Sequence, residues 1–256
     1  MEWEGRAVLI TGGSRGIGLA AAGRFLGAGA SVMIAGRSAE ALAAAQAELS
    51  CPGRLRTVAA DVRTVPGCRT AAAAAQDAFG RLDVLFTNAG SYEAAPVPEV
   101  TEDMWDRTID THLKGTFFCV QAAEPALRDA RGCVVTMASD AGLLGFRGGW
   151  AAYCAAMGGV VNLTRQLAVD LAPEVRVNAL APGPVGTQHL YDDLASASYG
   201  GFEETGDAVA AVTDTVPMRR IIEPDEIARA VLFLAGMESM TGSVLSVDGG
   251  TSIALP

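Results

Sequence analysis

The stretch TGGSRGIG, residues 11–18, joins a short apolar run at 7–11 to an alanine-rich run at 16–28. Glycines let the backbone turn tightly and bring its N–H groups close to a bound phosphate, and the amino end of the following helix adds positive potential. Glycines also serve simple connections, so the stretch alone leaves that interpretation open. The strand predicted before it and the helix predicted after it favour a pyrophosphate-binding turn.

The rest of the chain repeats this alternation of short apolar runs and longer helical patterns. Seven strands are predicted, at 7–11, 31–35, 55–59, 83–87, 133–138, 176–180 and 243–247. Six helices are predicted between them, at 16–28, 39–49, 65–79, 104–130, 150–171 and 224–236. We expect one α/β domain over residues 1–256. Because crossovers between parallel strands are right-handed, its seven-stranded parallel sheet should be doubly wound, with helices on both faces.

The composition disfavours several classes of protein. Half of the residues are apolar, and the formal net charge of -10 disfavours nucleic acid as a partner. The acidic start at residues 1–5 is unlike a secretory signal, and the apolar runs are shorter than the ~20 residues of a membrane span. Five scattered cysteines without a CxxC pair indicate neither a disulfide framework nor a metal site. We therefore expect a cytoplasmic protein without a bound metal that acts on a small molecule and has no membrane partner.

Two arginines bear on which nucleotide is bound. Arg15 lies inside the glycine-rich turn, and Arg37 follows the second predicted strand. At the end of that strand an acidic residue typically binds the ribose diol of NAD, whereas an arginine accommodates the 2′-phosphate of NADP. The sequence therefore favours NADP(H) over NAD(H), and the alternative is that both arginines are ordinary surface charges.

Further motifs follow the glycine-rich turn in a fixed order along the chain. They are Asp61-Val62, Asn88-Ala89-Gly90, Ser139, Tyr153, Pro182-Gly183 through Thr187, and Val247-Asp248-Gly249-Gly250. In this order and spacing the chain resembles the short-chain dehydrogenase/reductase family nearly from end to end. The resemblance implies a Rossmann-like sheet, NAD(P) binding, and a homo-oligomer that is a dimer or a tetramer.

The resemblance also implies roles for the matching residues. Asp61 and Val62 would lie beside the adenine, Asn88 and Gly90 would support the cofactor, and Thr187 would lie near the nicotinamide amide. The full set assigned to the nucleotide is Gly12, Ser14, Arg15, Gly16, Ile17, Gly18, Arg37, Asp61, Val62, Asn88, Ala89, Gly90, Pro182, Gly183, Val185 and Thr187.

The catalytic group of the family is a serine, a tyrosine, a lysine four residues after the tyrosine, and an asparagine on the preceding long helix. The matching positions here carry Ser139, Tyr153, Met157 and His112. A free tyrosine titrates near ~10, and the family's lysine lowers that pKa. Met157 carries no charge and is typical of core packing, and Lys114, the single lysine, is on another helix.

His112 allows two interpretations. An imidazole with an ordinary pKa near ~6.5 can join a proton relay, and it can equally hydrogen-bond backbone carbonyls at a helix bend. The serine motif also departs from the family, because Ser139 and Tyr153 are separated by one residue more than expected, with Trp150 or a neighbour as the insertion. Asp140 matches by distance counted from Tyr153, and the alternative is that it is an exposed acid in a turn.

The long segment 188–216 between the last two predicted units is a candidate substrate lid. It mixes glycines with aromatic residues, namely Tyr191, Tyr199 and Phe202, and such a composition suits a movable cover over a ring-bearing or polyketide-like ligand. His189 and Tyr191 are candidate acid-base groups. A plain surface loop is the alternative.

Three functions remain open on the sequence. The first is an NADP(H)-dependent oxidoreductase, a ketoreductase or alcohol dehydrogenase for a mid-sized organic molecule. In it Tyr153 donates the proton, Ser139 contacts the carbonyl, and His112 or a water replaces part of the relay. The second is a dehydratase, isomerase or cyclase on the same scaffold. The third is a nucleotide-binding subunit without activity.

Overall fold

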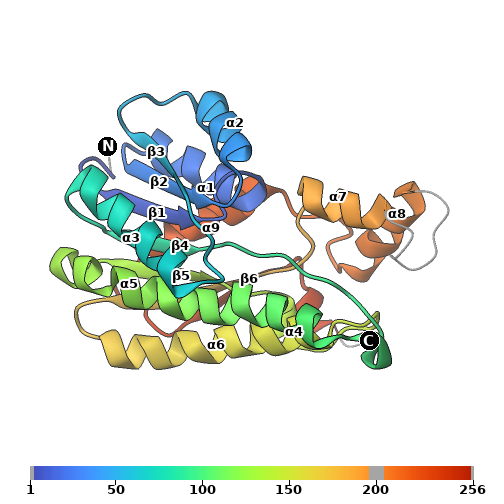
Figure 1. Ribbon diagram of the computed structural model, residues 1–256. Coiled ribbons are helices and arrows are strands. Elements are labelled where there is room, and N and C mark those ends of the chain that lie inside the picture. The colour runs from blue at the N-terminus through green and yellow to red at the C-terminus, as the bar shows by residue number, and fades with distance from the viewer. Residues whose placement is uncertain (1–2, 196–204, 255–256) are drawn as a thin grey trace.

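The computed structural model describes residues 3–195 and 205–254, and its centre is a seven-stranded sheet (Figure 1). The strands are β1 (Ala7–Thr11), β2 (Ser31–Gly36), β3 (Leu55–Ala59), β4 (Val84–Thr87), β5 (Cys133–Met137), β6 (Arg176–Pro182) and β7 (Val244–Val247). All six pairings are parallel, in the order β3-β2-β1-β4-β5-β6-β7. The fold class is therefore confirmed, and the order reverses between β1 and β4, where doubly wound sheets bind ligands.

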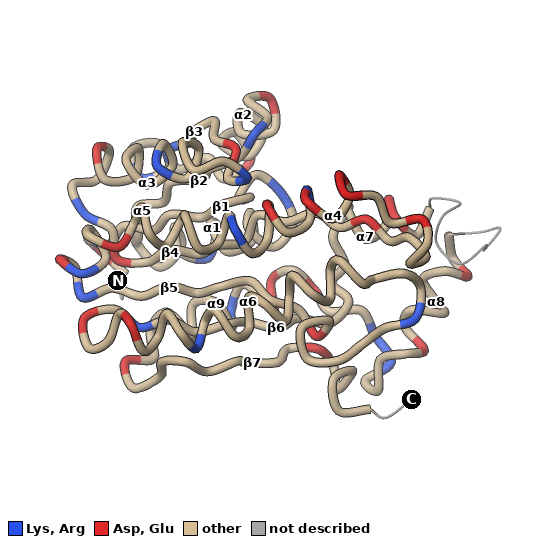
Figure 2. Tube along the Cα trace, turned by 60° about the horizontal axis from the view of Figure 1, so that its bottom comes forward, with Lys and Arg blue, Asp and Glu red and all other residues tan. Residues whose placement is uncertain are grey.

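Helices cover both faces of the sheet (Figures 1 and 2). One face packs on α1 (Gly16–Gly27), α2 (Ala39–Leu49) and α9 (Pro224–Gly236), through core residues such as Phe25, Leu42 and Ile227. The other face packs on α3 (Val65–Phe79), α5 (Gly115–Ala130) and α6 (Ala151–Leu171). Small alanines let these helices approach the sheet closely. Figure 2 shows acidic and basic residues interspersed along the described trace.

The helix predicted at 104–130 is helical throughout, from 102 to 130, and the structure adds a π turn that the prediction did not contain. The structure has α4 (Glu102–Ile109), a π-helical turn at Asp110–Lys114, and α5. The apolar periodicity runs across all three, because a π turn adds a residue without ending the helix. The turn stands where Gly115 passes Val62, since a Cβ on that glycine would lie 2.9 Å from the Val62 carbonyl oxygen. His112 lies inside this turn.

The described parts of the segment after β6 are helical, where the sequence suggested a movable cover or a plain surface loop. It contains α7 (Gln188–Ala195) and α8 (Thr205–Thr215), which pack on each other through Leu194, Ala208 and Val212. Figure 1 shows the two helices standing to one side of the sheet. Tyr199, Gly200, Gly201 and Phe202 lie outside the described residues. No helix within 3–195 or 205–254 is both long and apolar enough to cross a bilayer.

Candidate functional site

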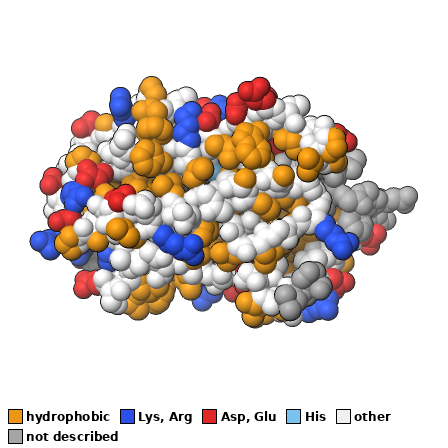
Figure 3. Space-filling model, turned by 90° about the horizontal axis from the view of Figure 1, so that it is seen from below, with side chains coloured by type: hydrophobic (Ala, Val, Ile, Leu, Met, Phe, Trp, Pro, Cys, Tyr) orange, Lys and Arg blue, Asp and Glu red, His pale blue; other side chains and the backbone are white. Residues whose placement is uncertain are grey.

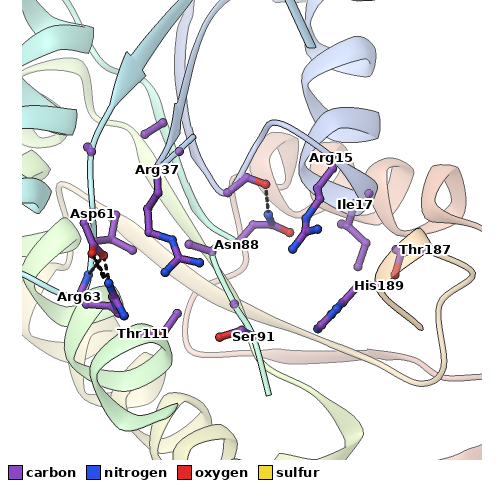
Figure 4. Close-up of a pocket in the computed structure, with 18 of the residues that line it drawn as sticks. Arg15, Ile17, Arg37, Asp61, Arg63, Asn88, Ser91, Thr111, Thr187 and His189 are labelled. Atoms are coloured by element: carbon purple, nitrogen blue, oxygen red, sulfur yellow. Dashed lines mark hydrogen bonds and ion pairs between the residues drawn. The ribbon is translucent and has the colours of Figure 1, made fainter. Parts of the chain in front are cut away.

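A pocket of about 240 Å³ opens at the carboxyl ends of β1, β2 and β4 (Figure 4). Most of the residues that the sequence assigned to a nucleotide lie around it: Gly12, Arg15, Gly16, Ile17, Arg37, Asp61, Val62, Asn88, Ala89, Gly90 and Thr187. Gln188 and His189 line the pocket on the side of α7, whereas Thr111 lines it near Arg63. Ser91 also belongs to the lining. The predicted residues thus converge on one cavity at the switch point of the sheet.

The glycine-rich turn is held by contacts that leave no space for side chains. Gly12 has a φ of +66°, and a Cβ there would lie 2.7 Å from Cα of Ala89. A Cβ on Gly18 would lie 2.5 Å from the carbonyl oxygen of Gly12. The side chain of Asn88 donates two hydrogen bonds of 3.0 Å, to the carbonyl oxygens of Thr11 and Gly12. The turn and the end of β4 therefore form one rigid edge of the pocket.

Two guanidinium groups enter this pocket. Figure 4 shows the side chains of Arg15 and Arg37 projecting into it from the glycine-rich turn and from the end of β2. Neither guanidinium forms a hydrogen bond or an ion pair with any residue in the described ranges, so both charges remain available to an anion. Arg15 also occupies the N-cap of α1, whose amino end receives no side-chain cap. Such an end offers backbone donors and positive potential to a phosphate.

Asp61 is paired within the pocket wall. Its carboxylate accepts hydrogen bonds from Arg63, including one of 2.6 Å from Nη2. The Arg63 guanidinium holds the pKa of Asp61 below its usual value. Sequence reasoning missed Arg63, although it directly follows the Asp61-Val62 motif. It brings a third guanidinium to the same pocket.

Five of the predicted nucleotide residues do not line the pocket. Ser14 and Gly18 support the turn, and Gly18 packs under it against Gly12. Pro182 pairs with Val247 in the sheet, and Val185 forms an isolated bridge with Ile222. Gly183 lies close to the neighbouring backbone, because a Cβ there would be 2.9 Å from Cα of Asp248. These residues shape the connection that leads from β6 to Thr187.

The predicted catalytic residues form a second group beside the pocket. Ser139 follows β5 and interacts with the phenol of Tyr153 on α6. Burial raises the pKa of Tyr153 to about 12, and the nearby Ser139 side chain opposes that rise. The charge of Asp140 raises it further. No lysine or arginine of the described chain is among the groups that shift this pKa.

His112 joins this group to the pocket wall. Its ring lies edge-on to Tyr153, with centroids 5.3 Å apart, and Nε2 lies 2.6 Å from the carbonyl oxygen of Ser91. The Ser91 amide nitrogen lies farther from Nε2, at 3.3 Å, so the shorter contact, to a carbonyl that only accepts, places the proton on Nε2. Burial lowers the pKa of His112 to about 4, so the ring is neutral at physiological pH. The ring also fills the space beside Gly90, where a Cβ would lie 2.5 Å from Cε1.

Asp140 is not the exposed turn acid that the sequence suggested as an alternative. It is 6% exposed and begins a short 3-10 turn, Asp140–Gly142. Its Oδ1 accepts 2.9 Å hydrogen bonds from the Ser139 hydroxyl and from the Ala141 amide. Burial raises the pKa of Asp140 to about 6, although these hydrogen bonds lower it.

Met157 lies one helical turn after Tyr153 and is 1% exposed. It packs in a small core with Ala138, Val160 and Ala179. Lys114 lies on the π-helical turn, where its Nζ donates a 3.0 Å hydrogen bond to Asp110. The one lysine of the chain is therefore paired with Asp110, four residues before it.

Sequence reasoning missed an aromatic cluster next to Tyr153. Tyr92 packs against Tyr153 at 5.5 Å, against Trp150 at 5.3 Å and against His189 at 4.7 Å between centroids. We call Tyr92, Trp150, Tyr153 and His189 the aromatic cluster. Position after the Asn88-Ala89-Gly90 motif is the signal that could have identified Tyr92, since residues just past a parallel strand lie at the ligand edge.

Comparison with known proteins agrees with this architecture. A family model described as enoyl-(acyl carrier protein) reductase matches residues 12–252. The BbsD subunit of a hydroxy(phenyl)methylsuccinyl-CoA dehydrogenase from Thauera aromatica is 36% identical over 258 residues, covering 99% of both chains. Meso-2,3-butanediol dehydrogenase from Serratia marcescens is 35% identical, covering 98% of this chain and 96% of that protein.

A solved structure adds a likeness in three dimensions. An actinorhodin polyketide ketoreductase variant, crystallised with NADPH, superposes with a TM-score of 0.92 at 31% identity, covering 97% of this chain and 98% of the other. The chain belongs to the short-chain dehydrogenase/reductase family, whose members use NAD(P)(H). It is an oxidoreductase of that family that acts on a small molecule.

Proposed function

We propose that the protein is an NADP(H)-dependent ketoreductase or alcohol dehydrogenase for a mid-sized, ring-bearing organic molecule. The observation that carries this proposal is the position of the Ser139–Tyr153 pair beside the pocket. His112 touches Tyr153 on one side and the pocket residue Ser91 on the other. A phenol that can exchange a proton therefore adjoins the place proposed for the nucleotide.

The pocket fits a dinucleotide phosphate. The close approach of Gly12 to Ala89 forms a cradle that a Cβ would fill, and the uncapped amino end of α1 faces it. In this proposal Gly12 to Gly18 bind the pyrophosphate, Asp61 and Val62 lie beside the adenine, and Thr187 contacts the nicotinamide amide. Arg37, with Arg15 and Arg63 near it, binds the 2′-phosphate, which NADP has and NAD lacks.

In this proposal the nucleotide and the protein each supply a part of the chemistry at the substrate. When bound, the nicotinamide gives or takes a hydride at the substrate carbon. Tyr153 exchanges the proton with the substrate oxygen, and Ser139, which lies near Tyr153, contacts that oxygen. His112 positions the Gly90-Ser91 backbone, because its Nε2 proton is already used by the Ser91 carbonyl.

The site is atypical in this proposal. Met157 takes the place of the family's lysine, and His112 takes the place of its asparagine. The buried thioether supplies no positive charge to the phenol, which supports the high pKa of Tyr153, about 12. Loss of such proton-transfer assistance typically costs ~10²–10⁴ in rate.

The aromatic cluster supports a substrate with a ring. Tyr92 and Trp150 place flat apolar faces next to Tyr153, and aromatic side chains bind rings through offset or edge-on contacts. His189 contributes both to this cluster and to the pocket wall, so α7 reaches the site. We therefore propose that the segment 188–216 covers the substrate.

We also propose that the protein is a cytoplasmic homo-oligomer. All five cysteines are free thiols, as in a reducing compartment. Figure 3 shows several hydrophobic patches on the face that lies at the bottom of Figure 1. Val169 of α6 is 75% exposed and Phe117 of α5 is 37% exposed, so this surface has apolar side chains to bury in a dimer or tetramer.

The test follows the absorbance of reduced nicotinamide with a panel of cyclic and linear ketones, using NADPH and NADH in parallel. The proposal expects ketone-dependent NADPH consumption that is lost in Tyr153→Phe. Product formed without any nucleotide would instead identify a dehydratase, isomerase or cyclase. Tight NADPH binding without turnover of any ketone or alcohol would identify a nucleotide-binding subunit.

A further inference from the structure

We propose that Asp140, acting through Ser139, holds the proton that Tyr153 exchanges with the substrate, and so replaces the assistance that a neighbouring cation would give. This inference rests on the proposed oxidoreductase function. Asp140 reaches the phenol only through Ser139, so it is a positioning residue of the site that also stores a proton.

The fold brings three groups together. Ser139 lies two residues after the end of β5 with an extended backbone, and its hydroxyl donates a 2.9 Å hydrogen bond to the Asp140 carboxylate. Tyr153 on α6 packs against the same small core as Ala138 and Ala141, and both Ser139 and Asp140 act on the pKa of its phenol. The Ala141 amide donates to both Ser139 Oγ, at 3.2 Å, and Asp140 Oδ1, at 2.9 Å. This amide fixes the two oxygens relative to each other before any substrate arrives.

The surroundings of Asp140 contain no competing cation among the described residues. The titratable groups that act on it or respond to its charge are Tyr153 and Cys154 on α6 and Asp248 after β7. Asp248 is committed elsewhere, because its carboxylate accepts hydrogen bonds from the Gly250 amide at 2.9 Å and the Ser252 amide at 2.8 Å. An acid buried without a cation takes up a proton more readily than one in water.

The hydroxyl of Ser139 sets the direction of transfer. A serine hydroxyl has one proton to donate and two lone pairs with which to accept. With Asp140 ionised, that one proton is given to Oδ1, at 2.9 Å, so Ser139 can only accept from Tyr153. In the relay, the phenol donates to Ser139 in the same sense in which Ser139 donates to the carboxylate.

Alcohol oxidation moves protons along this relay in one direction, from the substrate to Asp140. The substrate carbon loses a hydride, with its two electrons, to the nucleotide, and the substrate hydroxyl proton passes to Tyr153 Oη. The phenol proton moves to Ser139 Oγ, and the Ser139 proton moves to Asp140. One C–H and one O–H bond break in the substrate, a carbonyl forms, and one proton ends on the carboxylate. Ketone reduction reverses every transfer and starts from protonated Asp140.

This arrangement removes the need for a free phenolate. The pKa of Tyr153 is about 12, so a resting phenolate is scarce near neutral pH. Tyr153 receives one proton as it gives up another, so its net charge does not change. Asp140, with its pKa raised to about 6, can both take and return a proton in the ordinary range of pH.

The relay predicts that the rates of alcohol oxidation and ketone reduction depend on pH in opposite ways. Alcohol oxidation needs ionised Asp140, so its rate falls as the pH drops below about 6, whereas ketone reduction needs the acid and its rate falls above about 6. Asp140→Asn keeps the shape and an acceptor oxygen but abolishes the charge. It should remove the pH dependence near 6 in both directions and lower kcat by ~10² or more, with KM and NADPH affinity changed less than about twofold.

The deciding experiment is an infrared titration of the Asp140 carboxyl, in which the band is assigned by its loss in Asp140→Asn. In the wild type it should titrate near pH 6, and both Ser139→Ala and Tyr153→Phe should move the midpoint upward, because hydrogen bonding to the carboxylate is weakened. A midpoint that stays in place in Tyr153→Phe overturns the relay.

The two proposals fail in different ways in this experiment. If the titration shows coupling among Asp140, Ser139 and Tyr153 but no ketone or alcohol exchanges hydride, the relay stands and the redox function fails. If turnover is found but Asp140→Asn keeps the wild-type pH profiles, the redox function stands and the relay fails.

Discussion

Met157 lies one turn after Tyr153 on α6, with only 1% of its side chain exposed, and places a thioether rather than a charge near the phenol. The packing with Ala138, Val160 and Ala179 shows that the position belongs to a closed apolar core. The proton chemistry of this site must therefore come from other groups, and Ser139 and Asp140 are the ones that the structure brings to Tyr153.

Replacing Met157 by lysine tests the role of the missing charge. An ammonium one turn from Tyr153 favours the phenolate, so the pKa of Tyr153 should fall from about 12 and kcat should rise, by up to ~10²-fold. The buried charge should also lower the melting temperature. The checks are pH–rate profiles and thermal unfolding, with the uncharged Met157→Leu as control. Identical pH profiles for the two variants would show that this position does not act on the phenol.

Arg37 should decide the choice between the two nucleotides. Its guanidinium forms no ion pair within the described residues and projects into the pocket. Hydrogen bonds to a charged group contribute ~1.5–3 kcal/mol, so Arg37→Ala should weaken NADPH binding by ~10-fold or more and NADH binding little. Calorimetric titration with both nucleotides measures this. Arg165→Ala, on the exposed side of α6, is the control for net charge. Equal losses for NADPH and NADH would contradict the assignment of Arg37 to the 2′-phosphate.

His112 should make the fold sensitive to acid. Its pKa is about 4 in the folded state against 6.5 in the unfolded chain, so the unfolded state binds the proton first as the pH falls. The contribution of His112 to the free energy of unfolding is fully present above about pH 6.5 and is lost as the pH falls toward 4. It is on the order of 3 kcal/mol.

Urea unfolding of wild type and His112→Gln at several pH values measures this contribution. Glutamine still donates to the Ser91 carbonyl but does not titrate. Asp140 titrates in the opposite sense, because its pKa is raised on folding, and it cancels in the comparison. A stability difference that does not change between pH 7 and 4 would contradict the buried, neutral imidazole.

Gly18 should tolerate no side chain. A Cβ there would lie 2.5 Å from the Gly12 carbonyl oxygen and 2.6 Å from Nδ2 of Asn88, so Gly18→Ala should destabilise the fold by ~1–3 kcal/mol and weaken NADPH binding. Gly27→Ala is the matched control on the same helix, since nothing lies within 4 Å of its Cβ. It should be neutral or stabilising, because alanine favours helix. Equal destabilisation by both changes would argue against a close-packed turn.

The sequence predicted the sheet well because the inner strands β1, β2, β4, β5 and β6 are largely buried and most of them read as nearly continuous apolar runs. Boundaries moved by one or two residues; for example, Asp83 precedes β4 and binds the Ala7 amide with its carboxylate at 2.8 Å. The π-helical turn was not predictable, because apolar periodicity does not report an extra residue within a turn. Helices α7 and α8 were missed because they pack mainly on each other, and their mixed composition hides that small core.

Within the candidate site, motifs located residues whose neighbours are close in sequence or fixed by the sheet. Arg15, Arg37 and Asn88 all reach the pocket. The sequence did not show that Asp140 turns inward and accepts a hydrogen bond from Ser139. In a short turn, a shift of one residue along the chain changes which side chain is buried. The contact of Tyr92 with Trp150 joins two loops far apart in sequence, and only the folded chain shows it.

The most direct test of the account is to follow a deuteride from the nicotinamide ring of labelled NADPH into product by mass spectrometry. Each ketone of the panel is incubated with wild type and with Tyr153→Phe. The account predicts deuterium at the former carbonyl carbon, formed ~10²–10⁴ times more slowly by the variant. Product without deuterium, or a label transferred equally fast by Tyr153→Phe, would contradict it.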